Sequence, residues 1–163
     1  MISVSKNPGP SAWNDLLPKR EPLPSLSGNL KSDWLIVGAG FAGLSAARRV
    51  QQEAPNDSIV ILDAQGLASG PAGRNSGFMI DLPHDLASDD YGGQIENDRE
   101  AIMQNRYAIN FAKETVEALK LPRECFKEIG KINGAATAKG MRHNHDYAKH
   151  LSKLGEKYEH LDA

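Results

Sequence analysis

The sequence has a single cysteine, Cys125, among 163 residues. One thiol cannot form an internal disulfide and cannot supply a cysteine-rich zinc site, so we expect a protein of the reducing cytoplasm. Long apolar runs are also lacking, since stretches such as Trp34–Val37 and Ile59–Leu62 have only the length of strands. A membrane-spanning helix needs about 20 apolar residues, so no span is predicted.

The sequence also lacks an excess of either charge, because 19 Lys+Arg nearly balance 21 Asp+Glu. Binding a polyanion needs a basic surface, so no nucleic-acid partner is expected. The C-terminal histidines do not predict a metal site, since His143 and His145 on a helix would point about 200° apart. Asp146 and His150 lie four residues apart and are expected to pair on a solvated surface.

Residues 1–32 are rich in proline, with Pro8, Pro10, Pro18, Pro22 and Pro24. Proline fixes φ and removes a hydrogen-bond donor, so we expect an arm through which no helix or central strand runs. Apolar side chains could fix this arm to a neighbouring surface, and the candidates are Trp13, Leu16 and Leu17. The alternative is a disordered leader.

Residues 33–80 have the pattern of a β-α-β unit. Residues 33–37 read as a buried strand, residues 44–53 as a helix, and residues 58–63 as a second strand. Strands that are apolar on both faces belong to a parallel sheet covered on both sides. Residues 81–163 predict a helix over 98–120 with an apolar stripe, a short strand pair within 126–138, and a polar helix over 139–158. The fold class is therefore α/β.

A glycine-rich turn, Gly38-x-Gly40-x-x-Gly43, connects the first strand to the helix. Gly38 allows the tight turn, Gly40 lets the backbone approach a pyrophosphate, and Gly43 lets the helix pack closely on the strand. The helix N-terminus offers N–H groups to the phosphates. Asp63 ends the second strand, where a carboxylate accepts hydrogen bonds from an adenosine ribose. The turn therefore predicts a dinucleotide site, although this pattern does not separate FAD from NAD.

The loop after the second strand distinguishes these cofactors. Residues 69–79, Ser-Gly-Pro-Ala-Gly-Arg-Asn-Ser-Gly-Phe-Met, resemble the glycine-rich loop of FAD-dependent oxidoreductases of the D-amino-acid-oxidase-like (DAO) family. Among these, γ-glutamylputrescine oxidase-type proteins are the most similar, and the resemblance is continuous from about Trp13 to Met79. The chain departs from that pattern where Pro71 and Ala72 precede Gly73, and where Ser76 replaces a frequent glycine.

The resemblance implies a Rossmann-like FAD-binding βαβ start, followed by part of an α+β substrate domain. It implies FAD as the cofactor and no metal. For Arg74, the alternative to a flavin contact is an exposed side chain in a salt bridge. The residues expected to contact FAD are Gly38, Gly40, Phe41, Ala42, Gly43, Asp63, Ala64, Arg74, Asn75, Ser76, Gly77 and Phe78. No catalytic residue is identified.

The function that the resemblance implies is oxidation of a C–N bond in a small amine or amino acid. A hydride equivalent passes to the flavin, and water hydrolyses the resulting imine. Relatives are considerably longer, so we expect the N-terminal part of an enzyme, whose sheet the remainder of the enzyme or a partner chain completes. The alternatives are a non-catalytic dinucleotide-binding fragment or subunit, and an NAD-linked enzyme.

Overall fold

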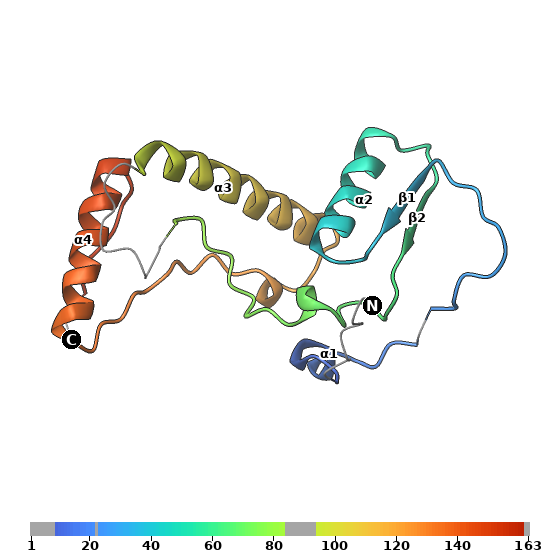
Figure 1. The fold of residues 1–163 in the computed structure, drawn as a ribbon, viewed down its shortest axis with the longest axis horizontal. Coiled ribbons are helices and arrows are strands. Elements are labelled where there is room, and N and C mark those ends of the chain that lie inside the picture. Colours follow the sequence, from blue (N-terminus) through green and yellow to red (C-terminus); the bar gives the residue numbers. More distant parts are fainter. Residues whose placement is uncertain (1–8, 22, 84–93, 162–163) are drawn as a thin grey trace, which may run out of the picture. The chain divides into compact units, whose positions relative to one another are not determined.

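The computed structural model describes residues 9–21, 23–83 and 94–161 (Figure 1). The chain divides into two compact units, Met1–Phe78 and Met79–Ala163. The first unit contains the helix α1 (Ala12–Leu16), the strands β1 (Trp34–Val37) and β2 (Ile59–Leu62), the helix α2 (Phe41–Glu53) and a short 3₁₀ helix, η1 (Pro71–Gly73). The second unit contains the helices α3 and α4 and a second short 3₁₀ helix, η2 (Arg123–Cys125).

The first unit is built around a two-stranded parallel sheet. β1 (Trp34–Val37) and β2 (Ile59–Leu62) pair in register, from Trp34 opposite Ile59 to Val37 opposite Leu62. The helix α2 (Phe41–Glu53) connects the strands and contacts both, as Figure 1 shows. This arrangement is a β-α-β unit, as the sequence pattern predicted.

Side-chain bonds fix the start of the two strands. The Asp33 carboxylate accepts hydrogen bonds from the backbone N–H of Ser58 at 2.8 Å and from its hydroxyl at 2.7 Å. The Ser58 hydroxyl oxygen in turn accepts from the Asp33 N–H at 3.0 Å. These bonds lower the pKa of Asp33. Residues 33 and 58 therefore flank the ladder as a reciprocal polar pair, one residue before each strand.

The expectation that β1 is buried is wrong for the described part of the chain. Leu35 is 60% exposed and Val37 is 81% exposed. The reason is that the sheet has only two strands among the described residues, with α2 packed against them. An apolar sheet surface is therefore left open to solvent.

The proline-rich arm contains a helix, contrary to expectation. α1 (Ala12–Leu16) lies between Pro10 and Pro18, in a stretch of the arm that is free of proline. The Ser11 side chain accepts a hydrogen bond from the Asn14 N–H at 3.2 Å and caps the helix. Leu16 remains 77% exposed, so it does not fix the arm to the unit.

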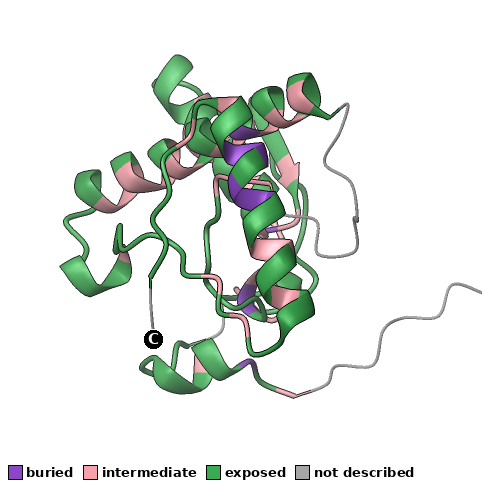
Figure 2. Cartoon of the chain, turned by 90° about the vertical axis from the view of Figure 1, so that its left-hand side faces the viewer, coloured by how far each residue is buried: buried purple, intermediate pink, exposed green. Residues whose placement is uncertain are grey.

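The second unit contains two long helices, α3 (Ile95–Ala118) and α4 (Ala138–Leu154), which contact each other. The Thr137 hydroxyl caps α4 by accepting from the Gly140 N–H at 3.1 Å, and Gly155, with φ 81°, ends the helix. Among the described residues, no helix has both the length and the apolar character needed to cross a membrane. Half of the buried residues that the structure describes lie on α4 (Figure 2), and these are Tyr147, Ala148, His150 and Leu151.

A buried polar pair joins the two helices. His150 of α4 is 2% exposed, and its Nε2 lies 2.6 Å from Oδ2 of Asp98 on α3. The expected surface pair between Asp146 and His150 is therefore wrong, since Asp146 pairs instead with Lys149 at 2.9 Å. The reason is helical geometry: residue 150 shares a face with Tyr147, three residues earlier, which is buried.

The predicted strand pair within residues 126–138 is also absent, because residues 126–137 form neither strand nor helix. Gly130 interrupts the stretch with φ 74°, in the left-handed region. Ile129 and Ile132 are each 80% exposed, so this stretch buries no apolar surface that would hold two strands together.

The buried pair generates a stability prediction. His150→Ala is expected to lower the free energy of unfolding by about 1–3 kcal/mol, because it leaves the Asp98 carboxylate without its imidazole partner at the helix contact. Urea unfolding of the full-length protein measures this change. Lys149→Ala, which removes an exposed ion pair worth about 0–1 kcal/mol, is the control. Equal destabilisation by the two variants would contradict the role of the His150–Asp98 pair.

Candidate functional site

The turn between β1 and α2 brings backbone N–H groups to one end of the sheet. Gly38 has φ 101°, a conformation that favours glycine, and its N–H donates to the Leu62 carbonyl at 2.7 Å. The first bond of α2 runs from the Leu44 N–H to the Gly40 carbonyl at 3.0 Å. The N–H groups before Leu44 therefore lie at the helix N-terminus, where they can donate to an anion.

Gly43 is required by packing inside the protein. A Cβ added at Gly43 would lie 1.9 Å from the Gly38 carbonyl oxygen and 3.2 Å from the Ile36 side chain. No side chain fits at such a distance, so only glycine lets α2 approach the end of β1 this closely. The packing role predicted for Gly43 agrees with this geometry.

Gly40 lies in a different environment. It has φ −84°, which any residue adopts, and a Cβ there would meet nothing nearer than the Ala72 Cβ at 3.9 Å. The protein itself therefore leaves room for a side chain at this position. A bound group that occupies this space would account for glycine here, and the adjacent helix N-terminus suits a phosphate. The residues of the turn thus fit the dinucleotide predicted from the sequence.

Asp63 closes the turn from the second strand. Its Oδ2 accepts from the Ala39 N–H at 2.7 Å, and its Oδ1 accepts from the Gln65 N–H at 2.8 Å. These two bonds lower the pKa of Asp63. Their contribution to folding is therefore present above the ordinary carboxyl pKa of about 3.9 and is lost as the pH falls through the lowered value. Sequence reasoning did not predict this structural role.

The same carboxylate is exposed and still has acceptor capacity. An ionised carboxylate offers about four lone-pair positions, of which the two backbone N–H groups use two. Asp63 can therefore accept from ribose hydroxyls while it holds the turn. Ala64, which follows it, is also exposed.

The glycine-rich loop after β2 lies beside the turn, since Ala72 is the nearest neighbour of the Gly40 position. η1 (Pro71–Gly73) forms the first part of the loop. A Cβ at Gly73 would lie 1.9 Å from the Ala68 carbonyl oxygen, so this glycine is also required by close backbone approach. The inserted Pro71 and Ala72 are therefore part of a compact turn.

The second part of the loop is held by polar bonds of Asn75. Its amide nitrogen donates to the Ala72 carbonyl, and its Oδ1 accepts from the Gly77 N–H at 2.7 Å. Gly77 has φ 79°, in the left-handed region. Ser76 is exposed, and Phe78 is 77% exposed. These residues form an open backbone loop with an aromatic ring at its end.

Arg74 is engaged with backbone carbonyls. Its guanidinium donates to the carbonyl of Ser69 at 3.0 Å and to the carbonyl of Gly9 in the arm. Sequence reasoning expected a flavin contact or a salt bridge for this side chain. In the structure its side chain joins the loop to the arm, and the flavin contact stays a prediction.

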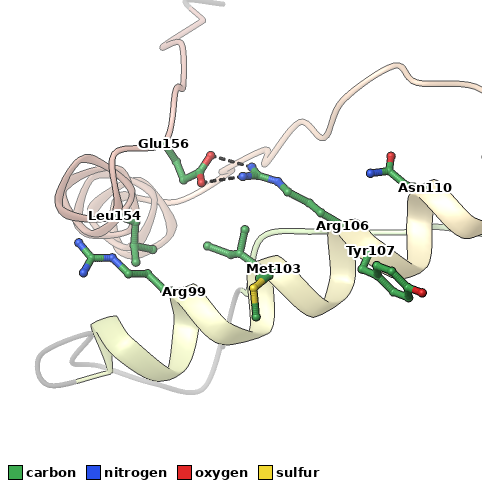
Figure 3. A pocket seen from close by; sticks show the side chains of 8 residues that line it. Arg99, Met103, Arg106, Tyr107, Asn110, Leu154 and Glu156 are labelled. Atoms are coloured by element: carbon green, nitrogen blue, oxygen red, sulfur yellow. Dashed lines mark hydrogen bonds and ion pairs between the residues drawn. The ribbon is translucent and has the colours of Figure 1, made fainter.

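A separate hollow of about 590 Å³ lies in the second unit (Figure 3). Within it, Arg106 donates two bonds to the Glu156 carboxylate, at 3.0 and 2.7 Å, and its Nε donates to Asp81 at 2.8 Å. These partners raise the pKa of Arg106. Two carboxylates already neutralise this guanidinium, so it is not left to bind an anionic ligand. None of the residues predicted to contact FAD line this hollow, which is bordered by Arg99, Ile102, Met103, Arg106, Tyr107, Asn110, Leu154 and Glu156.

The two glycines of the turn generate a paired prediction. Gly43→Ala is expected to lower the free energy of unfolding by about 2–4 kcal/mol, because its Cβ cannot be placed without moving α2 from β1. Gly40→Ser is expected to change it by less than about 1 kcal/mol, since serine is accepted at a helix N-cap and has space there. Thermal or urea unfolding in the absence of FAD measures both. Similar losses for the two variants would contradict the difference between the two positions.

Comparisons with known proteins agree with this geometry. The family model described as FAD dependent oxidoreductase (DAO) matches residues 33–163. A protein named "Probable oxidoreductase OrdL" from Rhizobium meliloti (strain 1021) is 32% identical over 71 residues, which cover 44% of this chain. The matched stretch spans only 16% of that relative's length. No solved structure gives a significant match.

The family match covers most of the chain, including the turn at residues 38–43, the loop at residues 69–78 and the whole second unit. The chain therefore belongs to the DAO family of FAD-dependent oxidoreductases, and its cofactor is FAD.

Proposed function

We propose that the turn at residues 38–43 holds the pyrophosphate of FAD and that the loop at residues 69–78 lies along its ribityl chain and flavin ring. The observation that supports this most strongly is the open position at Gly40. It lies at the N-terminus of α2 and next to Ala72 of the loop, so a group bound there meets both segments.

In this proposal each part of the first unit has one task. The N–H groups at the start of α2, from Phe41, Ala42 and Gly43, donate to the phosphates. The Asp63 carboxylate accepts from the hydroxyls of the adenosine ribose, beside the exposed Ala64. The small residues of the loop permit close backbone approach to the cofactor.

The loop residues complete the proposed site around the flavin. The Asn75 carbonyl and the Gly77 N–H are already bonded, to Trp13 and to the Asn75 side chain. Ser76 and the remaining exposed sides of Asn75 and Gly77 would face the cofactor, with Phe78 beyond them. Arg74 would act mainly by holding the loop, given its bonds to two carbonyls. N–H groups near the flavin would stabilise negative charge on the ring.

We further propose that the complete enzyme oxidises a C–N bond of a small amine or amino acid. The support is the resemblance of the Arg74–Asn75 loop to γ-glutamylputrescine oxidase-type proteins. Bound FAD would supply the oxidising chemistry by accepting one hydride equivalent, which carries the two electrons, from the carbon that bears the nitrogen. Water then adds to the imine product and releases an aldehyde or keto acid together with ammonia or an amine.

The exposed apolar sheet indicates where further parts of such an enzyme would pack. Leu35 and Val37 are 60% and 81% exposed, and an apolar surface of this kind is normally covered in a parallel sheet. We propose that further strands, from the remainder of the enzyme or from a partner chain, complete the sheet. The same observation favours the second candidate function, a non-catalytic dinucleotide-binding subunit that needs a partner chain.

The visible absorption spectrum of the purified full-length protein tests the proposed function. We expect a flavin spectrum that is bleached anaerobically by a substrate amine. Gly40→Val is expected to abolish FAD retention in a folded protein, because the added side chain occupies the phosphate position. Normal flavin content in this variant would contradict the placement of the phosphates. Bound flavin that no amine or amino acid reduces would favour the non-catalytic subunit.

Asp63 generates a second prediction on cofactor binding. Asp63→Ala is expected to weaken FAD binding by about 1–3 kcal/mol, because ribose hydroxyls lose their acceptor. Asp63→Asn keeps the size of the side chain and removes its charge, so it shows how much of the loss in FAD affinity is due to the charge. Since the pKa of Asp63 is lowered, its contribution should persist from neutral pH down to about pH 4.

Fluorescence titration with FAD measures both Asp63 variants, and turnover at saturating FAD is expected to change little. A large fall in turnover at unchanged FAD affinity would show that Asp63 has a different task.

A further inference from the structure

The arm and the FAD loop are joined by side chains of α1 and its cap. The indole Nε1–H of Trp13 donates to the Asn75 carbonyl at 2.8 Å. The Ser11 hydroxyl donates to the Ala68 carbonyl at 3.5 Å, and the Asn14 amide donates to the same carbonyl at 3.4 Å. Ser11 is also only 1% exposed. Side chains of three residues, Ser11, Trp13 and Asn14, therefore attach α1 and its cap to both ends of the loop.

The loop returns a bond to the arm. The Arg74 guanidinium reaches the Gly9 carbonyl, which lies 65 residues earlier in the chain. The arm is therefore bonded to the loop on both sides of η1, at Ala68 before it and at Arg74 and Asn75 after it. The loop is thus held from outside as well as by its own Asn75 bonds.

Trp13 contacts the loop with its ring as well as with its N–H. A Cβ built at Gly77 would lie 3.2 Å from Cζ2 of the indole. The backbone of Gly77, with φ 79°, therefore passes close to the indole ring, and no side chain lies between them. The indole therefore packs against the loop from Asn75 to Gly77.

We propose that Trp13 is a positioning residue for the cofactor: the arm holds the loop at residues 67–77 in the conformation that receives FAD. This inference rests on the proposed function, in which the loop lies along the flavin. Residues 74–78 are all exposed, so the loop gains little order from burial. A loop that is fixed before binding loses less conformational freedom when the ligand arrives, and its affinity is higher for that reason.

Three variants of the full-length protein test this role. Trp13→Ala removes the ring and the N–H, whereas Trp13→Phe removes only the N–H. Leu16→Ala is the control, because Leu16 lies on the same helix and is 77% exposed. Hydrogen–deuterium exchange of the FAD-free protein reports on the loop directly, and titration with FAD gives the dissociation constant.

In Trp13→Ala we expect faster exchange at residues 67–78, unchanged exchange in α2 and α4, and a dissociation constant for FAD raised about tenfold. Trp13→Phe should lie between this variant and the parent protein. Leu16→Ala should match the parent protein.

Unchanged exchange in the loop of Trp13→Ala would overturn the inference, because the arm would then not fix the loop. Faster exchange with unchanged FAD affinity would also overturn it, since the ordered loop would not serve the cofactor. Faster exchange throughout the protein, in both Trp13 variants, would assign Trp13 to general stability and overturn its positioning role. The proposed FAD site fails separately, if Gly40→Val retains normal flavin.

Discussion

The close approach of Gly43 to the Gly38 carbonyl is the constraint on which the site depends. A Cβ at residue 43 would lie 1.9 Å from that oxygen, so α2 can begin at the end of β1 only with glycine there. This approach places the N-terminus of α2 at the C-terminal end of β1. It also leaves the space at Gly40 open and brings the Ala39 N–H to the Asp63 carboxylate at 2.7 Å. One backbone contact thus organises both candidate anchors of the ADP half.

The loop repeats this physical solution on the other side of the site. Gly73 approaches the Ala68 carbonyl as closely as Gly43 approaches Gly38, again at 1.9 Å for an added Cβ. The Ala68 carbonyl also accepts the bonds of Ser11 and Asn14 from the arm. The cofactor site proposed here is therefore made mostly of backbone, and its shape depends on short contacts that few side chains would tolerate.

Much of the first unit could be predicted from the sequence, because its signals are local. The apolar runs 34–37 and 59–62 and the glycine spacing specify strand, turn and helix within about 30 residues. The arm could not be predicted in the same way. Trp13 was among the side chains expected to fix the arm, but its partner, the Asn75 carbonyl, lies 62 residues further along the chain and no local signal identifies it. The strand pair predicted within 126–138 is missing, and its isoleucines, Ile129 and Ile132, bury no apolar face.

Titrating the isotope-labelled protein with FAD, while following the backbone amide resonances, tests the cofactor site directly. We expect the largest shifts at residues 39–43 and 69–78, and with ADP alone only in the first group. Shifts concentrated in the second unit, with the turn unaffected, would contradict the central claim that the Gly38–Gly43 turn receives the cofactor.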